Sequence, residues 1–217
     1  MQTKAAADNW ASTLETKYDF AITRLVERES TKAAVEAACF SAAAELEAGD
    51  AFVLIYVGHG GRHPDSWSAD LDEADGYDEG PALPVEGEED TYQLWIDDRI
   101  REVLGAFVPG VKITCVFDTC NSGTSTRVAR PRSISEEAMN HLLFSSCTAT
   151  GTALVVGGGT IFELYARRAL EKSGTGITAK GFYDRLYALG AEYSYFPQNQ
   201  DPQLEGPESL KNSRLFV

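Results

Sequence analysis

Residues 51–60 read AFVLIYVGHG, and residues 112–123 read KITCVFDTCNSG. Each stretch holds a short apolar run, rich in β-branched and aromatic residues, that stops at a turn containing glycine. Runs of this length and composition are typical of buried strands in a parallel sheet. Residues 141–147, HLLFSSC, form a third run of the same kind. We therefore predict three fully buried strands of one mostly parallel sheet.

Segments with a helical repeat of apolar residues lie between and beyond these strands. A period of 3.6 residues predicts helices over residues 31–47, 97–107 and 160–172, and another that begins after Thr178. Residues 65–90 are rich in Asp, Glu, Gly and Pro and show little periodicity, so we predict a long surface loop there. Strands that alternate with helices predict an α/β fold, with helices flanking a mostly parallel central sheet.

The size and charge of the chain narrow the class of protein. Its 217 residues suit one domain, and its formal net charge is −14. Nucleic-acid binding needs a basic stripe, whereas most Lys and Arg residues are scattered here, so we expect no nucleic-acid partner. No apolar stretch approaches the roughly 18 residues that span a bilayer, and the N-terminus has no apolar signal core. We therefore expect a cytoplasmic protein with no membrane partner.

The four cysteines give no sign of a zinc site. Cys39, Cys115, Cys120 and Cys147 form no CxxC pair. Nothing indicates secretion, so we expect free thiols in a reducing compartment. Cys39 lies on the apolar face of a predicted helix and Cys115 within a predicted strand, so we expect both in the core.

His59 and Cys120 each come just after a predicted strand. Parallel sheets bind ligands beyond the carboxyl ends of their strands, and neighbouring strands would bring these two side chains together. Histidine is the base suited to forming a thiolate at neutral pH. The flanking glycines let a peptide backbone approach and let main-chain N–H groups face an oxyanion. The pattern predicts a catalytic Cys–His pair; a structural histidine and cysteine are the alternative.

Several motifs resemble those of the metacaspases and their bacterial relatives, in the caspase-like clan of cysteine peptidases. VGHG at 57–60 and DTCNSG at 118–123 look like the family's two signature motifs. Further segments follow its pattern over nearly the whole chain: DEADGYDE at 72–79, IDD at 96–98, SSC at 145–147 and QDPQ at 200–203. The caspase pentapeptide around the nucleophile is absent, which favours a metacaspase-like protein over a true caspase.

The resemblance implies a caspase-like three-layer sandwich and peptide-bond hydrolysis through a thioester. Cys120 would be the nucleophile, His59 would pass a proton to the leaving amine, and the main-chain N–H groups of Gly60 and Cys120 would hold the oxyanion. Two aspartates of the family, matched here by Asp118 and Asp8, bind a substrate arginine or lysine. The implied substrate is therefore a protein or peptide with Arg or Lys before the cleaved bond. A turn aspartate at 118 and a helix N-terminal acid at 8 are the structural alternatives.

The implied chemistry requires no cofactor, but the resemblance suggests calcium as one. Some metacaspases bind calcium through carboxylates that match Asp78, Asp97 and Asp98. A fourth carboxylate of the family falls near Arg127 here. Solvated surface acids are the alternative interpretation.

Three arginines, Arg127, Arg130 and Arg132, stand in a predicted loop after the nucleophile. A peptidase specific for arginine would meet arginine in its own loop. We therefore regard these residues as candidates for self-cleavage, with a solvated basic loop as the alternative.

The resemblance gives one caspase-like domain over residues 1–217, with a large-subunit-like half at 1–126 and a small-subunit-like half at 136–217. The family pattern opens with an apolar strand before the Asp8 region, and this sequence shows no such strand, which would leave a sheet edge unpaired. A truncated start and a different strand in the same place are the alternatives. The lack of that strand favours a rival function, a catalytically inactive caspase-like module that regulates or binds partners. The presence of His59 and Cys120 favours the enzyme. We expect a monomer.

Overall fold

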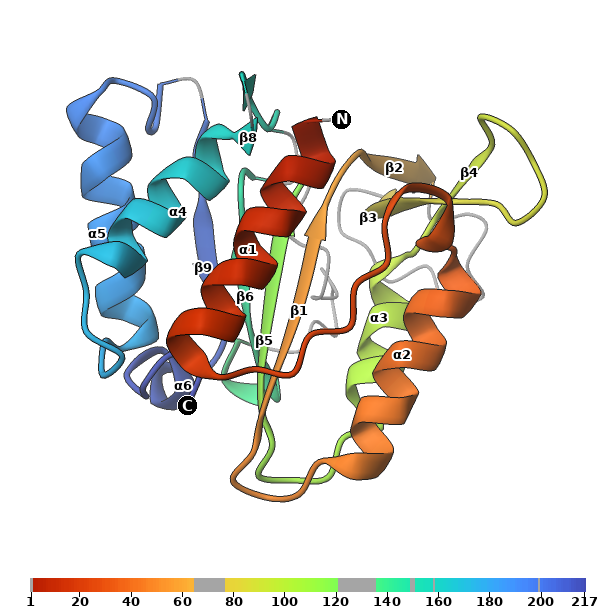
Figure 1. Cartoon of the computed structure of the whole chain (residues 1–217), viewed down its shortest axis with the longest axis horizontal. Coiled ribbons are helices and arrows are strands. Elements are labelled where there is room, and N and C mark those ends of the chain that lie inside the picture. Colours follow the sequence, from red (N-terminus) through yellow and green to blue (C-terminus); the bar gives the residue numbers. More distant parts are fainter. Residues whose placement is uncertain (1, 65–76, 121–135, 149–150, 158, 199) are drawn as a thin grey trace.

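The computed structural model describes residues 2–64, 77–120, 136–148, 151–157, 159–198 and 200–217. Its elements appear in Figure 1 in this order along the chain: α1 (Gln2–Tyr18), η1 (Glu27–Glu29), α2 (Lys32–Glu45), β1 (Ala51–Val57), β2 (Gly60–Pro64), β3 (Tyr77–Pro84), β4 (Tyr92–Leu94), α3 (Asp97–Leu104), β5 (Lys112–Asp118), η3 (Glu136–Ala138), β6 (His141–Ser145), β7 (Val155–Val156), β8 (Gly159–Thr160), α4 (Ile161–Glu171), α5 (Ala179–Glu192), β9 (Gln203–Glu205) and α6 (Glu208–Lys211).

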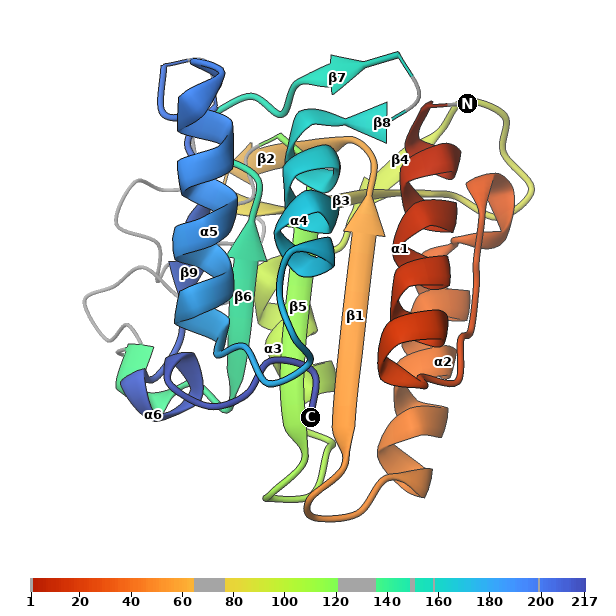
Figure 2. The ribbon, with the colours of Figure 1, turned by 60° about the vertical axis from the view of Figure 1, so that its left-hand side comes forward.

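The main sheet has the strand order β1-β5-β6-β9. β1 pairs with β5 and β5 with β6 in parallel, whereas β9 joins β6 antiparallel. The three parallel strands all point toward the same end of the sheet (Figure 2). The structure confirms the predicted α/β fold with a mostly parallel central sheet, and it places the predicted strands and helices within a few residues of their expected bounds.

Helices cover both faces of this sheet, and each face has its own hydrophobic core. On one face α1, α4 and α5 pack over Val116 and Phe144. On the other face α2 and α3 pack over Cys115 and Phe117. Successive residues of β5 thus enter opposite cores, as the pleat of a strand requires. Cys39 and Cys115 are both buried in the second core, as predicted.

The prediction of a loop over residues 65–90 is wrong for residues 77–84, which form β3. This strand pairs antiparallel with both β2 and β4 in a small second sheet. Gly80 allows the close approach, because a Cβ there would lie only 2.1 Å from the carbonyl oxygen of Trp95. Backbone pairing and the buried side chain of Leu83 outweigh a composition that is typical of loops.

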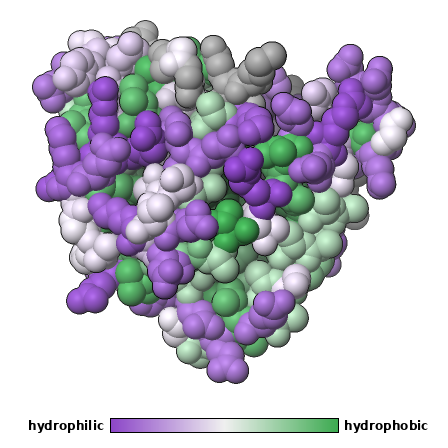
Figure 3. Space-filling view, viewed as in Figure 1, coloured by the Kyte–Doolittle hydropathy of each residue, from purple (hydrophilic) through white to green (hydrophobic). Residues whose placement is uncertain are grey.

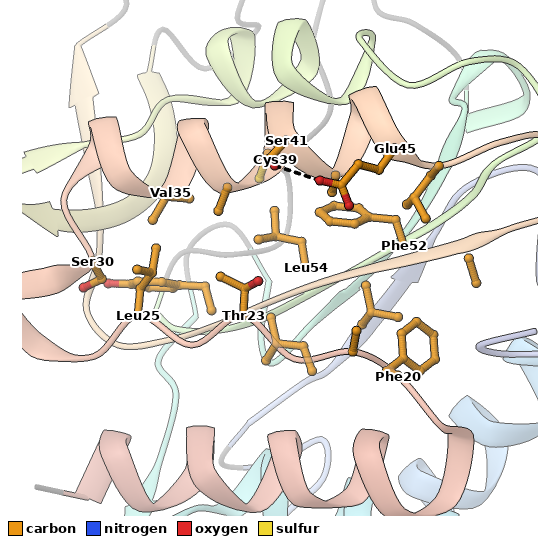
Figure 4. Close-up of a pocket in the computed structure, with 18 of the residues that line it drawn as sticks. Phe20, Thr23, Leu25, Ser30, Val35, Cys39, Ser41, Glu45, Phe52 and Leu54 are labelled. Atoms are coloured by element: carbon orange, nitrogen blue, oxygen red, sulfur yellow. Dashed lines mark hydrogen bonds between the residues drawn. The ribbon is translucent and has the colours of Figure 1, made fainter.

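The prediction of full burial is also wrong for β1. All seven of its residues are only partly buried, because β1 is an edge strand that pairs with β5 alone. Within the described chain, no strand occupies its other edge. A cavity of about 530 Å³ lies there, lined by Phe52 and Leu54 of β1, by α2 and by residues 20–30 (Figure 4). Neither His59 nor Cys120 lines it.

The surface reflects this arrangement. Hydrophobic residues gather over α2, whereas α1 and the β3–β4 hairpin are mostly hydrophilic (Figure 3). None of the described helices combines the length and apolar character needed to cross a membrane.

Candidate active site

His59 and Cys120 follow two paired strands at the same end of the sheet. Val57 and Asp118 are register partners at the ends of β1 and β5, so His59 and Cys120 are each two residues further along. The amide of Gly58 extends the pairing by donating to the carbonyl oxygen of Asp118 at 3.3 Å. The structure therefore places side by side the two turns that carry the predicted catalytic pair.

Gly60 brings the backbones of the two motifs into direct contact. A Cβ at this position would lie 2.0 Å from the carbonyl oxygen of Cys120 and 2.5 Å from the hydroxyl of Thr119. No side chain fits in that space, so the contact requires glycine. Any residue other than glycine at this position would push the histidine turn away from the cysteine turn.

The backbone of His59 is held firmly, although its side chain is exposed. Its carbonyl oxygen accepts hydrogen bonds from the amide of Ala82 and the hydroxyl of Tyr56, both at 2.8 Å. The same tyrosine hydroxyl also lies 2.8 Å from the carbonyl oxygen of Ala82. The imidazole and the thiol of Cys120 are not hydrogen-bonded to each other in this structure, so catalysis would need the imidazole to turn toward the sulfur.

The half-buried sulfur of Cys120 accepts a hydrogen bond from the amide of Ala153 at 3.4 Å. This donor lies 33 residues further along the chain, beyond β6. An N–H group aimed at a sulfur stabilises the thiolate more than the thiol. Sequence reasoning missed Ala153, because nothing in an alanine side chain marks its backbone as a donor.

The turn that carries Cys120 is fixed by the segment after β6. Ser146 exchanges two hydrogen bonds with the backbone of Thr119, each at 3.1 Å. The thiol of Cys147 donates to the carbonyl oxygen of Thr119 at 3.2 Å. Gln200 then ties this segment to residue 154 by donating to the carbonyl of Ser146 and accepting from the amide of Leu154. The motifs SSC and QDPQ thus support the nucleophile turn.

Asp118 lies at the end of β5 on the α4 side of the sheet and is only 1% exposed. Its Oδ2 atom accepts a hydrogen bond from the hydroxyl of Thr160, and its Oδ1 atom accepts none from any described residue. Burial, together with the nearby carboxylate of Glu163, raises the pKa of this carboxyl group to about 7, although the hydrogen bond from Thr160 acts to lower it. Thr160, Glu163 and Ser146 are the groups that act on this carboxylate, so it has no cationic partner among the described residues.

Asp8 lies on α1, on the side opposite the buried Ala6 and Trp10. It is ion-paired with Lys4 at 2.8 Å and with Arg24 at 3.0 Å. The hydrogen bond from Lys4 lowers the pKa of its carboxyl group below the ordinary value. Asp8 and Asp118 share no polar contact, so the structure does not join the two predicted specificity residues.

Among the described residues, the three aspartates suggested as calcium ligands do not gather into one group. The described part of the chain contains no group of three or more His, Cys, Asp or Glu side chains that could hold a metal ion. Asp78 and Asp97 are buried, and Asp98 is ion-paired with Arg101.

The predicted self-cleavage residues Arg127, Arg130 and Arg132 lie outside the described residues.

A second cavity, of about 610 Å³, has His59 in its wall. The end of β1 forms one side, and η1 and the β3–β4 hairpin form the other. Exposed acids line it: Glu27, Glu29, Glu88 and Asp90. Arg28 crosses the gap to the hairpin with a weak ion pair to Glu89 at 3.8 Å. In the wall of the space beside the imidazole, acidic side chains outnumber the basic ones, Lys4 and Arg28.

Fold and site together define the class: an α/β protein of the caspase-like type, with a thiol and an imidazole at adjoining strand ends. The family model described as "Metacaspase, peptidase C14 domain" matches residues 4–129. The chain belongs to this metacaspase family.

Curated relatives agree with this assignment, and a solved structure shares the fold. Metacaspase-1A of Neurospora crassa is 43% identical over 76 residues, which are 35% of this chain and 15% of that protein. Metacaspase-1B of Aspergillus terreus is 33% identical over 124 residues, 52% of this chain and 31% of that protein. The chain thus spans less than a third of the length of these relatives. The crystal structure of protein GSU0716 from Geobacter sulfurreducens shares the fold, with a TM-score of 0.74, 24% identity, and coverage of 99% of this chain and 88% of that one.

Proposed function

We propose that this domain is a cysteine endopeptidase that cleaves protein or peptide substrates after arginine or lysine. Membership of a peptidase family and the placement of His59 beside Cys120 support the peptidase class. The buried carboxylate of Asp118 supports the preference for a basic residue.

The chemistry follows from the positions of the two side chains. His59 takes the proton of the Cys120 thiol, and the sulfur attacks the scissile carbonyl carbon. The C–N bond breaks as the thioester forms, and the imidazolium gives its proton to the leaving amine. Water then hydrolyses the thioester and restores the thiol. The N–H groups of Gly60 and Cys120 stabilise the oxyanion, and the cavity beside His59 accommodates residues after the cleaved bond.

The expected preference for arginine or lysine depends on Asp118. Its carboxylate lies on the residue that ends β5, and the described residues supply it with a neutral hydroxyl donor but no cation. Burial disfavours its charge, so a guanidinium or ammonium group that arrives with the substrate would relieve that cost. Asp8 already pairs with Lys4 and Arg24, so its contribution would require those pairs to open.

A positional peptide library tests this function directly. We expect arginine, then lysine, at the position before the cleaved bond, and no cleavage after aspartate. A profile dominated by aspartate or by an apolar residue at that position would contradict the role given to Asp118. Comparing the profile with and without calcium tests whether cleavage depends on this metal.

The second candidate function is a catalytically inactive module that binds partners. The unpaired edge of β1 and its apolar cavity favour it, since an exposed strand edge is a ready surface for pairing with another chain. This candidate predicts no turnover of any peptide and no dependence of partner binding on Cys120.

Self-cleavage is expected within residues 127–132 of the active protein. Incubation should convert one intact mass into two fragments, with the break after Arg127, Arg130 or Arg132. A variant with all three changed to glutamine should stay intact, as should Cys120→Ala. A single unchanged mass in protein that cleaves peptides would rule self-cleavage out.

A further inference from the structure

The junction of β8 and α4 holds a threonine with two different partners. Thr160 caps α4, because its hydroxyl oxygen accepts the amide hydrogen of Glu163 at 3.0 Å. The same hydroxyl donates its proton to Oδ2 of Asp118. A hydroxyl group has one proton, and the cap bond uses one of its lone pairs, so this geometry directs the proton to the carboxylate.

The hydrogen bond from Thr160 to Asp118 lies in buried surroundings. Thr160 and Glu163 are buried, at 3% and 2% exposed, so water does not replace a lost donor. Glu163 pairs with Arg167, which also reaches Glu171 at 3.6 Å, so this arginine is already engaged by carboxylates. The groups that face Asp118 are therefore Thr160 and Glu163 from the β8–α4 junction and Ser146 after β6. On α1, Lys4 and Asp8 pair with each other.

We propose that Thr160 is a positioning residue that keeps Asp118 ionised and oriented for a substrate arginine or lysine, and that Glu163 opposes it. A neutral hydroxyl stabilises a carboxylate without cancelling its charge, whereas a lysine or arginine in its place would occupy the site meant for the substrate. The carboxylate of Glu163 acts in the opposite direction, by repelling a second negative charge. This inference rests on the proposed function, because it assigns Asp118 to the substrate.

The readout is the ratio of kcat/KM for a peptide with arginine to that for the same peptide with citrulline, measured from pH 5 to 9. Citrulline has the shape of arginine without its charge, so the ratio reports the ionisation of Asp118 and cancels effects on Cys120 and His59. In Thr160→Val we expect the ratio at pH 7 to fall about fivefold and its midpoint to rise by about one pH unit, with citrulline cleavage little changed. Thr160→Ser should behave as the wild type.

Thr178→Val is the matched control. Thr178 caps α5 by the same bond, from the amide of Gly181 at 3.1 Å, but it does not contact Asp118. Thr178→Val should lose about as much stability as Thr160→Val and keep the wild-type ratio of kcat/KM values. Glu163→Gln provides a second test if Thr160→Val does not fold, because it keeps the cap amide and should move the midpoint to lower pH.

The outcomes separate this inference from the proposed function. One outcome is a wild type that prefers arginine in a pH-dependent way, with the midpoint unchanged in Thr160→Val and Glu163→Gln. That outcome would overturn the role of Thr160 and leave the proposed function standing. A wild type with no preference for arginine over citrulline would overturn both.

Discussion

Replacing Cys120 with alanine is expected to abolish peptide hydrolysis, lowering kcat/KM for an arginine peptide by roughly 10⁴-fold or more. The half-buried sulfur accepts the amide hydrogen of Ala153 and follows the strand beside His59. The remaining cysteines are buried: Cys39, Cys115 and Cys147. Burial raises the pKa of the Cys39 thiol to about 12 and that of Cys115 well above its usual range, so neither can replace the nucleophile.

His59→Ala should cost roughly 10²- to 10⁴-fold, the usual contribution of a general acid–base. Steady-state assays of a fluorogenic arginine peptide measure both losses. Cys39→Ala removes a buried thiol from the core under α2 and is the control, with expected turnover near that of the wild type. Retention of a tenth of the activity in Cys120→Ala would be incompatible with the assignment.

Asp118→Asn should lower kcat/KM for an arginine peptide by about 10²- to 10³-fold, because it breaks a buried charge pair with the substrate. Cleavage of the citrulline peptide should change little. Asp184→Asn removes an exposed acid paired with Lys180 on α5 and serves as the control. Equal losses for the arginine and citrulline peptides would show that Asp118 supports the fold rather than reading the substrate.

The same substitution should change how stability depends on pH. The pKa of the Asp118 carboxyl group is about 7 in the folded protein, against an ordinary value of 3.8. Between these two pKa values the folded state keeps a proton that the unfolded state releases. The contribution of this carboxyl group to the free energy of unfolding is therefore most favourable below about pH 4 and falls as the pH rises toward 7. The cost of the charge at pH 8 is on the order of 4 kcal/mol.

Asp118→Asn removes this cost. The difference between its melting temperature and that of the wild type should therefore shift in favour of the variant by roughly 5 °C or more from pH 5 to pH 8. Thermal denaturation of both proteins at the two pH values gives the difference. A gain that is the same at both pH values would show that this carboxyl group does not titrate in that range.

The sequence predicts the sheet well where apolar runs are continuous. β1, β5 and β6 begin at the predicted residues and end within two of them, because such runs have few other stable arrangements. β3 escapes prediction, since its stability comes from pairing with β2 and β4 and its own composition is typical of a loop. The partial burial of β1 likewise depends on which strands stand beside it, a property of the whole sheet.

The site, too, is predictable where its signal lies in a short stretch of sequence and unpredictable where it depends on contacts between distant residues. The Cys–His pair is predictable because both residues follow apolar strands in glycine turns. The hydrogen bond between Asp118 and Thr160 joins residues 42 positions apart, and no short motif records it. The only local signal is the capping pattern of Thr160 and Glu163 before an apolar helix, which predicts a helix start and nothing about an aspartate. Asp8 matches the family by position, yet its helix turns it toward Lys4 and Arg24.

Trapping the nucleophile tests the central claim most directly. The purified protein is treated with a peptidyl-arginine acyloxymethyl ketone, and intact mass and peptide mapping locate the adduct. We expect one adduct, on Cys120, formed at least about 100-fold more slowly in His59→Ala and absent in Cys120→Ala. No adduct, or one placed on another cysteine, would contradict the central claim and favour the inactive binding module.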